Sequence, residues 1–94
     1  MAFGAQLRQL KLDGNQIGDK GLEALSGALA TGAMPQLREL RLNNNKIGDA
    51  GVEALAKAAA TGALPRLKEI WVDNKHMQHP QLVAACQPRG IAIK

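Results

Sequence analysis

The chain has 94 residues, enough for one small domain, and its apolar residues are mostly Leu and Ala, with one Phe, one Trp and no Tyr. Its formal net charge of +4 is mild, and acidic residues are interspersed with basic ones, so there is no basic block typical of a nucleic-acid-binding tail. The N-terminal sequence does not read as a signal peptide, no apolar run approaches a membrane span, and the single Cys86 excludes an intrachain disulfide and favours a reducing, cytoplasmic location.

The first unit of the chain, residues 7–36, predicts a short strand followed by a helix. Its opening, LRQLKL, ends in an alternation of apolar and polar residues, which is typical of a strand with one buried face. Farther along, Leu22, Leu25 and Leu29 are spaced by three and four residues and form the apolar stripe of an amphipathic helix. We expect Asp19 to cap the N-terminus of this helix by accepting hydrogen bonds from its unpaired amides.

The second unit, residues 37–66, repeats the first, with about 18 of 30 positions identical. Asp49 repeats the expected helix cap. Gly32 and Gly62 follow the last helical residues, where a left-handed turn favours glycine, and a proline three residues later prevents each helix from continuing. Because a helix separates each pair of strands, successive strands must be parallel.

The third unit, residues 67–94, keeps the apolar positions but loses most of the glycines and the Asn. Such degeneracy is expected of a terminal repeat, because one of its sides faces solvent. Pro80 suits the first turn of a last helix, and GIAIK reads as a fourth strand with Ile91 and Ile93 pointing inward. We therefore predict an α/β fold with a parallel sheet of about four strands and about three helices behind it.

The motifs LRQLKLDGNQI and LRELRLNNNKI resemble the leucine-rich-repeat pattern L-x-x-L-x-L-x-x-N-x-I/L. The continuation GDxGxxxLxxA is similar to the ribonuclease-inhibitor-like subfamily, whose repeats carry a full helix. The resemblance extends from Leu7 to about Cys86. It implies a solenoid that forms a short arc, with strands on the concave side and helices on the convex side, in a single domain over residues 1–94. It also implies protein binding, although such repeats serve many different partners.

The resemblance further implies an internal ladder of asparagines. Asn15 and Asn45 would bond the backbone of the adjacent turn, which suits a side chain that carries both donors and an acceptor. Lys75 occupies the third position of the ladder and cannot accept a hydrogen bond. We therefore expect the ladder to end there, as it would at a cap.

The outward-pointing strand residues form the concave wall and are the candidate protein-binding surface. Arg41 and Trp71 are the leading contacts, because Arg and Trp are enriched at binding hot spots. The alternative for Trp71 is that it packs over the open end of the stack or onto the C-terminal tail. The candidate residues are Lys11, Asp13, Glu39, Arg41, Asn43, Glu69, Trp71 and Asp73.

Two functional hypotheses therefore compete. In the first, the chain is a recognition module whose concave wall binds a protein partner. In the second, it is a structural or scaffold repeat fragment without a dedicated ligand. The N-terminal edge of the sheet looks poorly protected, with Phe3 as a candidate cover. Either the chain is a piece of a longer array, or this edge pairs with another copy to form a homo-oligomer.

Other classes of function find little support. His76 and His79 have a zinc-like local spacing, but His76 aligns with turn-surface positions and Cys86 with the sheet-facing side of the helix, so these ligands would not converge. The glycines of KIGDAG match neither nucleotide-binding motif. Basic strand residues share their face with carboxylates and lack aromatic platforms apart from Trp71. We expect no catalytic residue, cofactor or metal, and no nucleic-acid or membrane partner.

Overall fold

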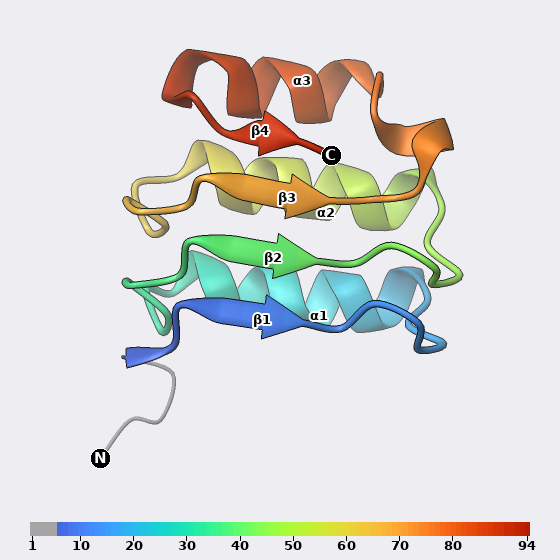
Figure 1. The fold of residues 1–94 in the computed structure, drawn as a ribbon, viewed down its shortest axis with the longest axis horizontal. Coiled ribbons are helices and arrows are strands. Elements are labelled where there is room, and N and C mark those ends of the chain that lie inside the picture. The colour runs from blue at the N-terminus through green and yellow to red at the C-terminus, as the bar shows by residue number, and fades with distance from the viewer. Residues whose placement is uncertain (1–5) are drawn as a thin grey trace.

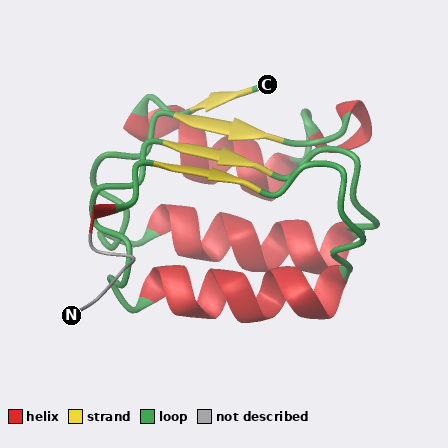
Figure 2. Ribbon diagram, turned by 60° about the horizontal axis from the view of Figure 1, so that its bottom comes forward, coloured by secondary structure: helices red, strands yellow, loops and turns green. Residues whose placement is uncertain are grey.

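The computed structural model describes residues 6–94, which form a parallel sheet and a layer of helices that covers one of its faces (Figure 1, Figure 2). The sheet order follows the chain order: β1 (Gln9–Lys11), β2 (Glu39–Arg41), β3 (Glu69–Trp71) and β4 (Ala92–Ile93). The α-helices are α1 (Asp19–Ala30), α2 (Asp49–Ala60) and α3 (Pro80–Cys86), and the 3₁₀ turns are η2 (Asn74–His76) and η3 (Gln87–Arg89). The predicted α/β arc with four parallel strands and three helices is confirmed. Phe3 lies outside the described residues.

The register of the sheet follows the spacing of the repeats. Leu10 lies opposite Leu40, Leu40 opposite Ile70, and Ile70 opposite Ile93. Each of these central residues points toward the helices, and Leu40 and Ile70 are completely buried. Because side chains alternate along a strand, the residues on either side of them point to the uncovered face. The same register therefore places equivalent residues of successive repeats side by side on that face.

Burial of the core rises from the first repeat to the second. Four apolar residues of the second repeat are at most 4% exposed: Leu40, Leu42, Ile47 and Leu55. Their counterparts in the first repeat are only partly buried: Leu10, Leu12, Ile17 and Leu25. The difference arises because the second repeat has a neighbour on each side, whereas β1 lies at an edge of the sheet. A single repeat cannot cover its own apolar surface, and stacking supplies the cover.

The prediction that Asp19 caps its own helix is wrong. The N-cap residue is Gly18, and Asp19 Oδ1 accepts hydrogen bonds from the backbone N–H groups of Gly48 (2.7 Å) and Gly51 (2.8 Å) at the start of α2. These amides belong to the first turn of a helix and have no intrahelical partner. A Cβ atom on Gly51 would lie 2.6 Å from the same oxygen, so a larger residue here would displace the Asp19 carboxylate from these amides. Asp19 therefore joins two repeats.

Asp49 does not cap its own helix either. The N-cap of α2 is Gly48, and the Asp49 side chain is 85% exposed. Its Oδ1 lies 3.9 Å from Nε2 of His79, the residue that occupies the aspartate position in the third repeat. The contact made by Asp19 is not repeated because the third repeat has glutamines, Gln78 and Gln81, where the second has Gly48 and Gly51.

The two long helices end differently. Gly32 adopts the predicted left-handed conformation after α1, with φ of 84°. Gly62 does not, which corrects the prediction, and the chain leaves α2 through an extended Thr61 (φ −79°, ψ 166°). The Arg89 guanidinium donates hydrogen bonds to the carbonyl oxygens of Thr61 and Leu64, the latter at 3.4 Å. A side chain from the third repeat thus satisfies carbonyl groups next to the end of α2, where a left-handed glycine would form a local turn.

Candidate functional site

The strand face is defined as the side of the sheet that no helix covers. Its side chains form three rows, and each row consists of equivalent residues from successive repeats. Five candidate residues occupy outward positions of the strands: Lys11, Glu39, Arg41, Glu69 and Trp71. The other three lie in the turns that follow the strands: Asp13, Asn43 and Asp73. Lys11 and Asp13, in the first repeat, are exposed, whereas the candidate residues of the second and third repeats are partly buried. The structure thus brings the strand residues together and places the other three at the ends of the same strands.

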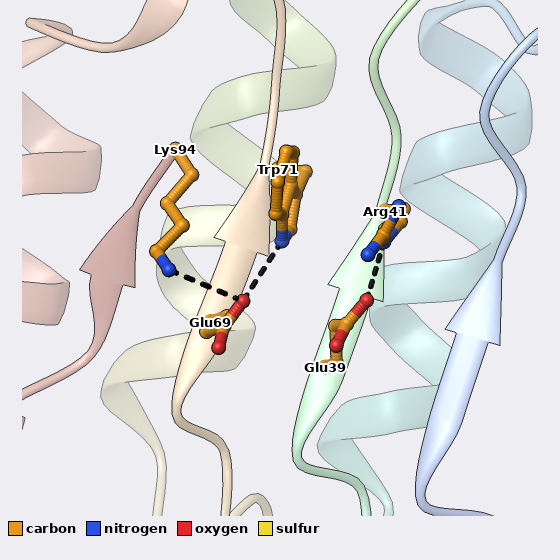
Figure 3. A network of polar contacts seen from close by, with 5 residues as sticks. All are labelled: Glu39, Arg41, Glu69, Trp71 and Lys94. Carbon is orange, nitrogen blue, oxygen red and sulfur yellow. Dashed lines mark hydrogen bonds and ion pairs between the residues drawn. The ribbon is translucent and has the colours of Figure 1, made fainter.

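Trp71 lies between two cations on this face (Figure 3). The guanidinium carbon of Arg41 is 4.4 Å from the centroid of the Trp71 ring, and Nζ of Lys94 is 5.8 Å from it. Contacts of this kind contribute about 0.5–1 kcal/mol each at exposed sites. The ring therefore lies on the strand face and also contacts the last residue of the chain, so it combines features of both interpretations drawn from the sequence.

Two glutamates complete the network around Trp71. Trp71 Nε1 donates a hydrogen bond of 3.0 Å to Glu69 Oε1, and Lys94 Nζ lies 3.7 Å from the same oxygen. Arg41 Nε donates to Glu39 Oε2. Both carboxylates are therefore engaged by side chains of the neighbouring row. This network holds a large aromatic and a guanidinium in fixed positions, which lowers the entropy that they lose when a partner binds.

Lys94 is the site residue that the sequence analysis missed. It follows directly after β4, and its backbone N–H donates to the carbonyl of Ile70 at 2.8 Å. The pairing of Ile93 with Ile70 places Lys94 next to Trp71. The signal was present in the predicted inward position of Ile93, because the next residue must then point to the strand face.

Beyond the strand ends, the structure shows one rung of the asparagine ladder. Asn45 Nδ2 donates to the carbonyl oxygens of Leu12 (2.9 Å) and Leu42 (3.0 Å), and its Oδ1 accepts from the N–H of Ile17 (3.1 Å). Asn15 bonds its own turn, with Nδ2 2.9 Å from the Leu12 carbonyl oxygen. Asn45 therefore ties the second repeat to the first, while Asn15 lies at the edge of the stack.

The third repeat replaces the rung with other side chains. Asp73 Oδ1 accepts a hydrogen bond of 2.8 Å from the N–H of Asn44. His76 is 5% exposed, and its Nε2 lies 2.9 Å from the carbonyl oxygen of Ile47. A carbonyl only accepts hydrogen bonds, so the ring carries a proton on Nε2. The prediction that His76 lies on the turn surface is therefore wrong.

His76 turns inward because one backbone hydrogen bond between the second and third repeats is missing. In the second repeat, the N–H of Lys46 donates to the Ile17 carbonyl at 3.0 Å. His76 occupies the position of Lys46, but its N–H bonds the Asp73 carbonyl (2.9 Å) inside η2. Its imidazole turns inward and supplies the donor that the Ile47 carbonyl would otherwise lack.

The structure gives Cys86 a packing role. The side chain is completely buried on α3, as its predicted sheet-facing position implies. Burial raises the pKa of the Cys86 thiol to about 11, and the nearby Arg89 charge opposes this rise. The thiol thus stays protonated at neutral pH, and a protonated thiol is a poor nucleophile and metal ligand.

Two further findings concern residues 6–94. No group of three or more His, Cys, Asp and Glu residues in this range is placed to hold a metal ion. None of the helices in the same range combines the length and the apolar character that crossing a membrane requires.

Comparison with known families agrees with the repeat structure. The Leucine Rich repeat family model matches residues 6–26 and 33–56, which fall mainly in the first and second repeats. The third repeat, with its altered turn residues, lies outside these ranges. No curated protein matches the chain.

Proposed function

We propose, from the premise that this chain is a leucine-rich repeat protein, that it is a non-enzymatic module that binds a protein partner through its strand face. Domains of this family generally mediate protein–protein interaction. The observation that carries the proposal is the stack of Arg41, Trp71 and Lys94 on the face that no helix covers. Arg and Trp are the residue types that most often dominate binding energy at protein interfaces.

The surroundings of the stack support this role. Trp71 is partly buried and its indole N–H is already bonded, so its polar group needs no new partner when the ring is covered. Lys11 lies beside Arg41 and adds a cation in the exposed first repeat. Polar groups at the strand ends come from Asp13, Asn43 and Asp73. This arrangement of an aromatic centre with a polar rim is common at protein interfaces.

The proposal predicts that the double variant Arg41→Glu, Trp71→Ala loses partner binding by about 30-fold or more, the equivalent of about 2 kcal/mol for a hot-spot pair. The immobilised chain is used to capture proteins from the source cell, and each captured protein is quantified by mass spectrometry. Lys20→Glu, an exposed charge reversal on α1, is the matched control and is expected to bind as the wild type does. Recovery of the same proteins by the double variant, with its circular dichroism unchanged, would refute the strand-face proposal.

Two finer assignments follow. We propose the ribonuclease-inhibitor-like subfamily, which the full helices of 12 residues in the first two repeats support. We also propose a cytoplasmic location. The lone and buried Cys86 supports it, because a reducing compartment suits a chain without disulfide pairing.

We propose self-association through the N-terminal edge as a second candidate function, in which the chain acts as a structural unit. The observation that favours it is the contrast between Leu10 and Leu12, which are partly buried, and their well-buried equivalents in the second repeat. An edge strand also presents backbone groups that can pair with another chain.

Self-association predicts that the average mass measured by light scattering rises with concentration toward that of a dimer in the millimolar range. The rise is expected to persist at high salt, because apolar burial and backbone pairing are not screened as surface charges are. A strictly monomeric mass throughout this range would contradict the proposal.

A further inference from the structure

A row of positive side chains runs along one border of the strand face, where the strands begin. Arg8, Arg38 and Lys68 occupy the same position in the three repeats, and all three are exposed. The backbone fixes them as neighbours: the N–H of Arg38 donates to the Arg8 carbonyl at 2.8 Å, and that of Lys68 to the Arg38 carbonyl at 2.8 Å. Adjacent strands are about 4.8 Å apart, so three like charges stand close together.

This row is not neutralised from within the described part of the chain. The ion pairs found among residues 6–94 join other groups, namely Arg41 with Glu39 and Lys94 with Glu69, and the Asp49 carboxylate lies 3.9 Å from Nε2 of His79. The carboxylates nearest in sequence, Glu39 and Glu69, are thus already engaged. Like charges on neighbouring strands are destabilising, so an uncompensated row costs folding energy that an external anion would recover.

The surface beside the row is hollowed. One hollow of about 540 Å³ is lined by Arg8, Gln9, Arg38, Glu39, Lys68 and Glu69. A second, of about 520 Å³, shares Arg38 and Lys68 with the first and is also lined by Pro65 and Arg66. Arg66 adds a fourth exposed cation. An extended segment that lies along the row thus meets cations in both hollows.

We propose that this basic edge, defined as Arg8, Arg38, Arg66 and Lys68, binds an acidic segment of the protein partner. The inference rests on the proposed function and specifies the chemistry of the partner. Glu and Asp side chains of the segment would enter the second hollow, which no carboxylate lines and where an Arg guanidinium can hold a carboxylate through two parallel hydrogen bonds. The aliphatic stems of Arg and Lys would cover the apolar part of the segment.

An acidic peptide fits this edge better than a nucleic acid does. The row from β1 to β3 spans two strand spacings, about 10 Å, which about three residues of an extended peptide match. A peptide can place its carboxylates in the second hollow, which no carboxylate lines, whereas a continuous phosphate backbone along the row would also face Glu39 and Glu69 in the first. Trp71 is the one Trp, Phe or Tyr residue among residues 6–94, so successive bases would find no series of aromatic rings on which to stack.

Fluorescein-labelled octaglutamate is the probe for this inference, with binding followed by fluorescence anisotropy. The wild type is expected to bind it with an affinity that falls steeply as salt is added. Arg38→Glu is expected to weaken binding by about tenfold or more, equivalent to about 1.4 kcal/mol. Lys20→Glu makes the same charge change on α1 and is expected to stay within about twofold of the wild type, since charges beyond about 10 Å are screened at ordinary ionic strength.

Three outcomes would overturn the inference: no binding of octaglutamate at low salt, equal affinities of the two charge-reversal variants, or tighter binding of single-stranded oligothymidylate than of octaglutamate. Arg38→Ala repeats the test without a new negative charge, and circular dichroism checks that each variant is folded. The two proposals fail separately. If Arg38→Glu keeps octaglutamate affinity while the Arg41 and Trp71 double variant loses its captured proteins, the strand-face proposal stands and the acidic-segment inference is wrong.

Discussion

Leu40→Ala is expected to lower the free energy of unfolding by about 2–5 kcal/mol, because it removes a large side chain and leaves a cavity. Leu40 is completely buried at the centre of β2, with β1 on one side and β3 on the other. The total stability of a small domain is about 5–15 kcal/mol, so this single change removes a large part of it. The measurement is urea denaturation followed by far-ultraviolet circular dichroism.

Leu10→Ala is the matched control, since Leu10 holds the same repeat position on the edge strand and is only partly buried. Its expected loss is smaller, below about 2 kcal/mol, because less apolar surface returns to water and the space left behind opens to solvent. Neither variant alters a side chain of the strand face. Equal losses for the two variants would contradict the rise in burial from the first repeat to the second.

The sheet and its register were predictable because the apolar residues recur every 30 residues. Leu10, Leu40 and Ile70 can share one buried row only if their strands are parallel and in the register that the structure shows. A shift by one residue would turn every buried side chain toward solvent. The helices were predictable for a similar reason, since Leu22 and Leu29 lie on one stripe and both are completely buried.

The helix ends were less predictable because their partners come from other repeats. Capping rules assign Asp19 to its own helix, whereas its carboxylate reaches amides about 30 residues farther along the chain. Gly62 resembles Gly32 in sequence, but carbonyls near the end of α2 are bonded by Arg89 of the last repeat. His76 turns inward because the Ile47 carbonyl lacks a backbone N–H donor. A local sequence pattern gives no sign that this donor is missing.

The strand face was predictable in position but not in its contacts. The register sets Glu39 directly beside Glu69, a pairing of like charges that would be unfavourable in isolation. The adjacent row offsets it, because Arg41 bonds Glu39 while Trp71 and Lys94 contact Glu69. These compensating contacts depend on side-chain conformations. The alternation of apolar and polar residues along a strand does not specify such conformations.

This compensation also separates the two regions that we propose to bind the partner. The centre of the strand face is internally satisfied and would contribute shape and apolar area. The basic edge is uncompensated and would contribute charge attraction. Charge reversal at Arg38 should therefore act mainly on the association rate and its salt dependence, whereas loss of Trp71 should act mainly on dissociation.

Asn45→Ala is expected to destabilise the chain by about 2–4 kcal/mol, since each buried polar group left without a partner costs about 1–3 kcal/mol. Asn45 is 9% exposed, and its amide serves the carbonyls of Leu12 and Leu42 and the N–H of Ile17. Two of these three groups belong to the first repeat, so the variant loosens the junction as well as the turn. Urea denaturation measures the loss.

Asn15→Ala removes the same side chain at the edge of the stack and is the matched control. Asn15 is exposed and bonds carbonyls of its own turn, so solvent replaces its contacts and the expected loss is below about 1 kcal/mol. Hydrogen exchange should also separate the two variants, because only Asn45→Ala removes the acceptor that protects the Ile17 amide. The contrary outcome is an equal loss of stability in both variants, with the Ile17 amide exchanging at the wild-type rate in each. Asn45 would then not hold the first repeat to the second, and the apolar core alone would maintain the stack.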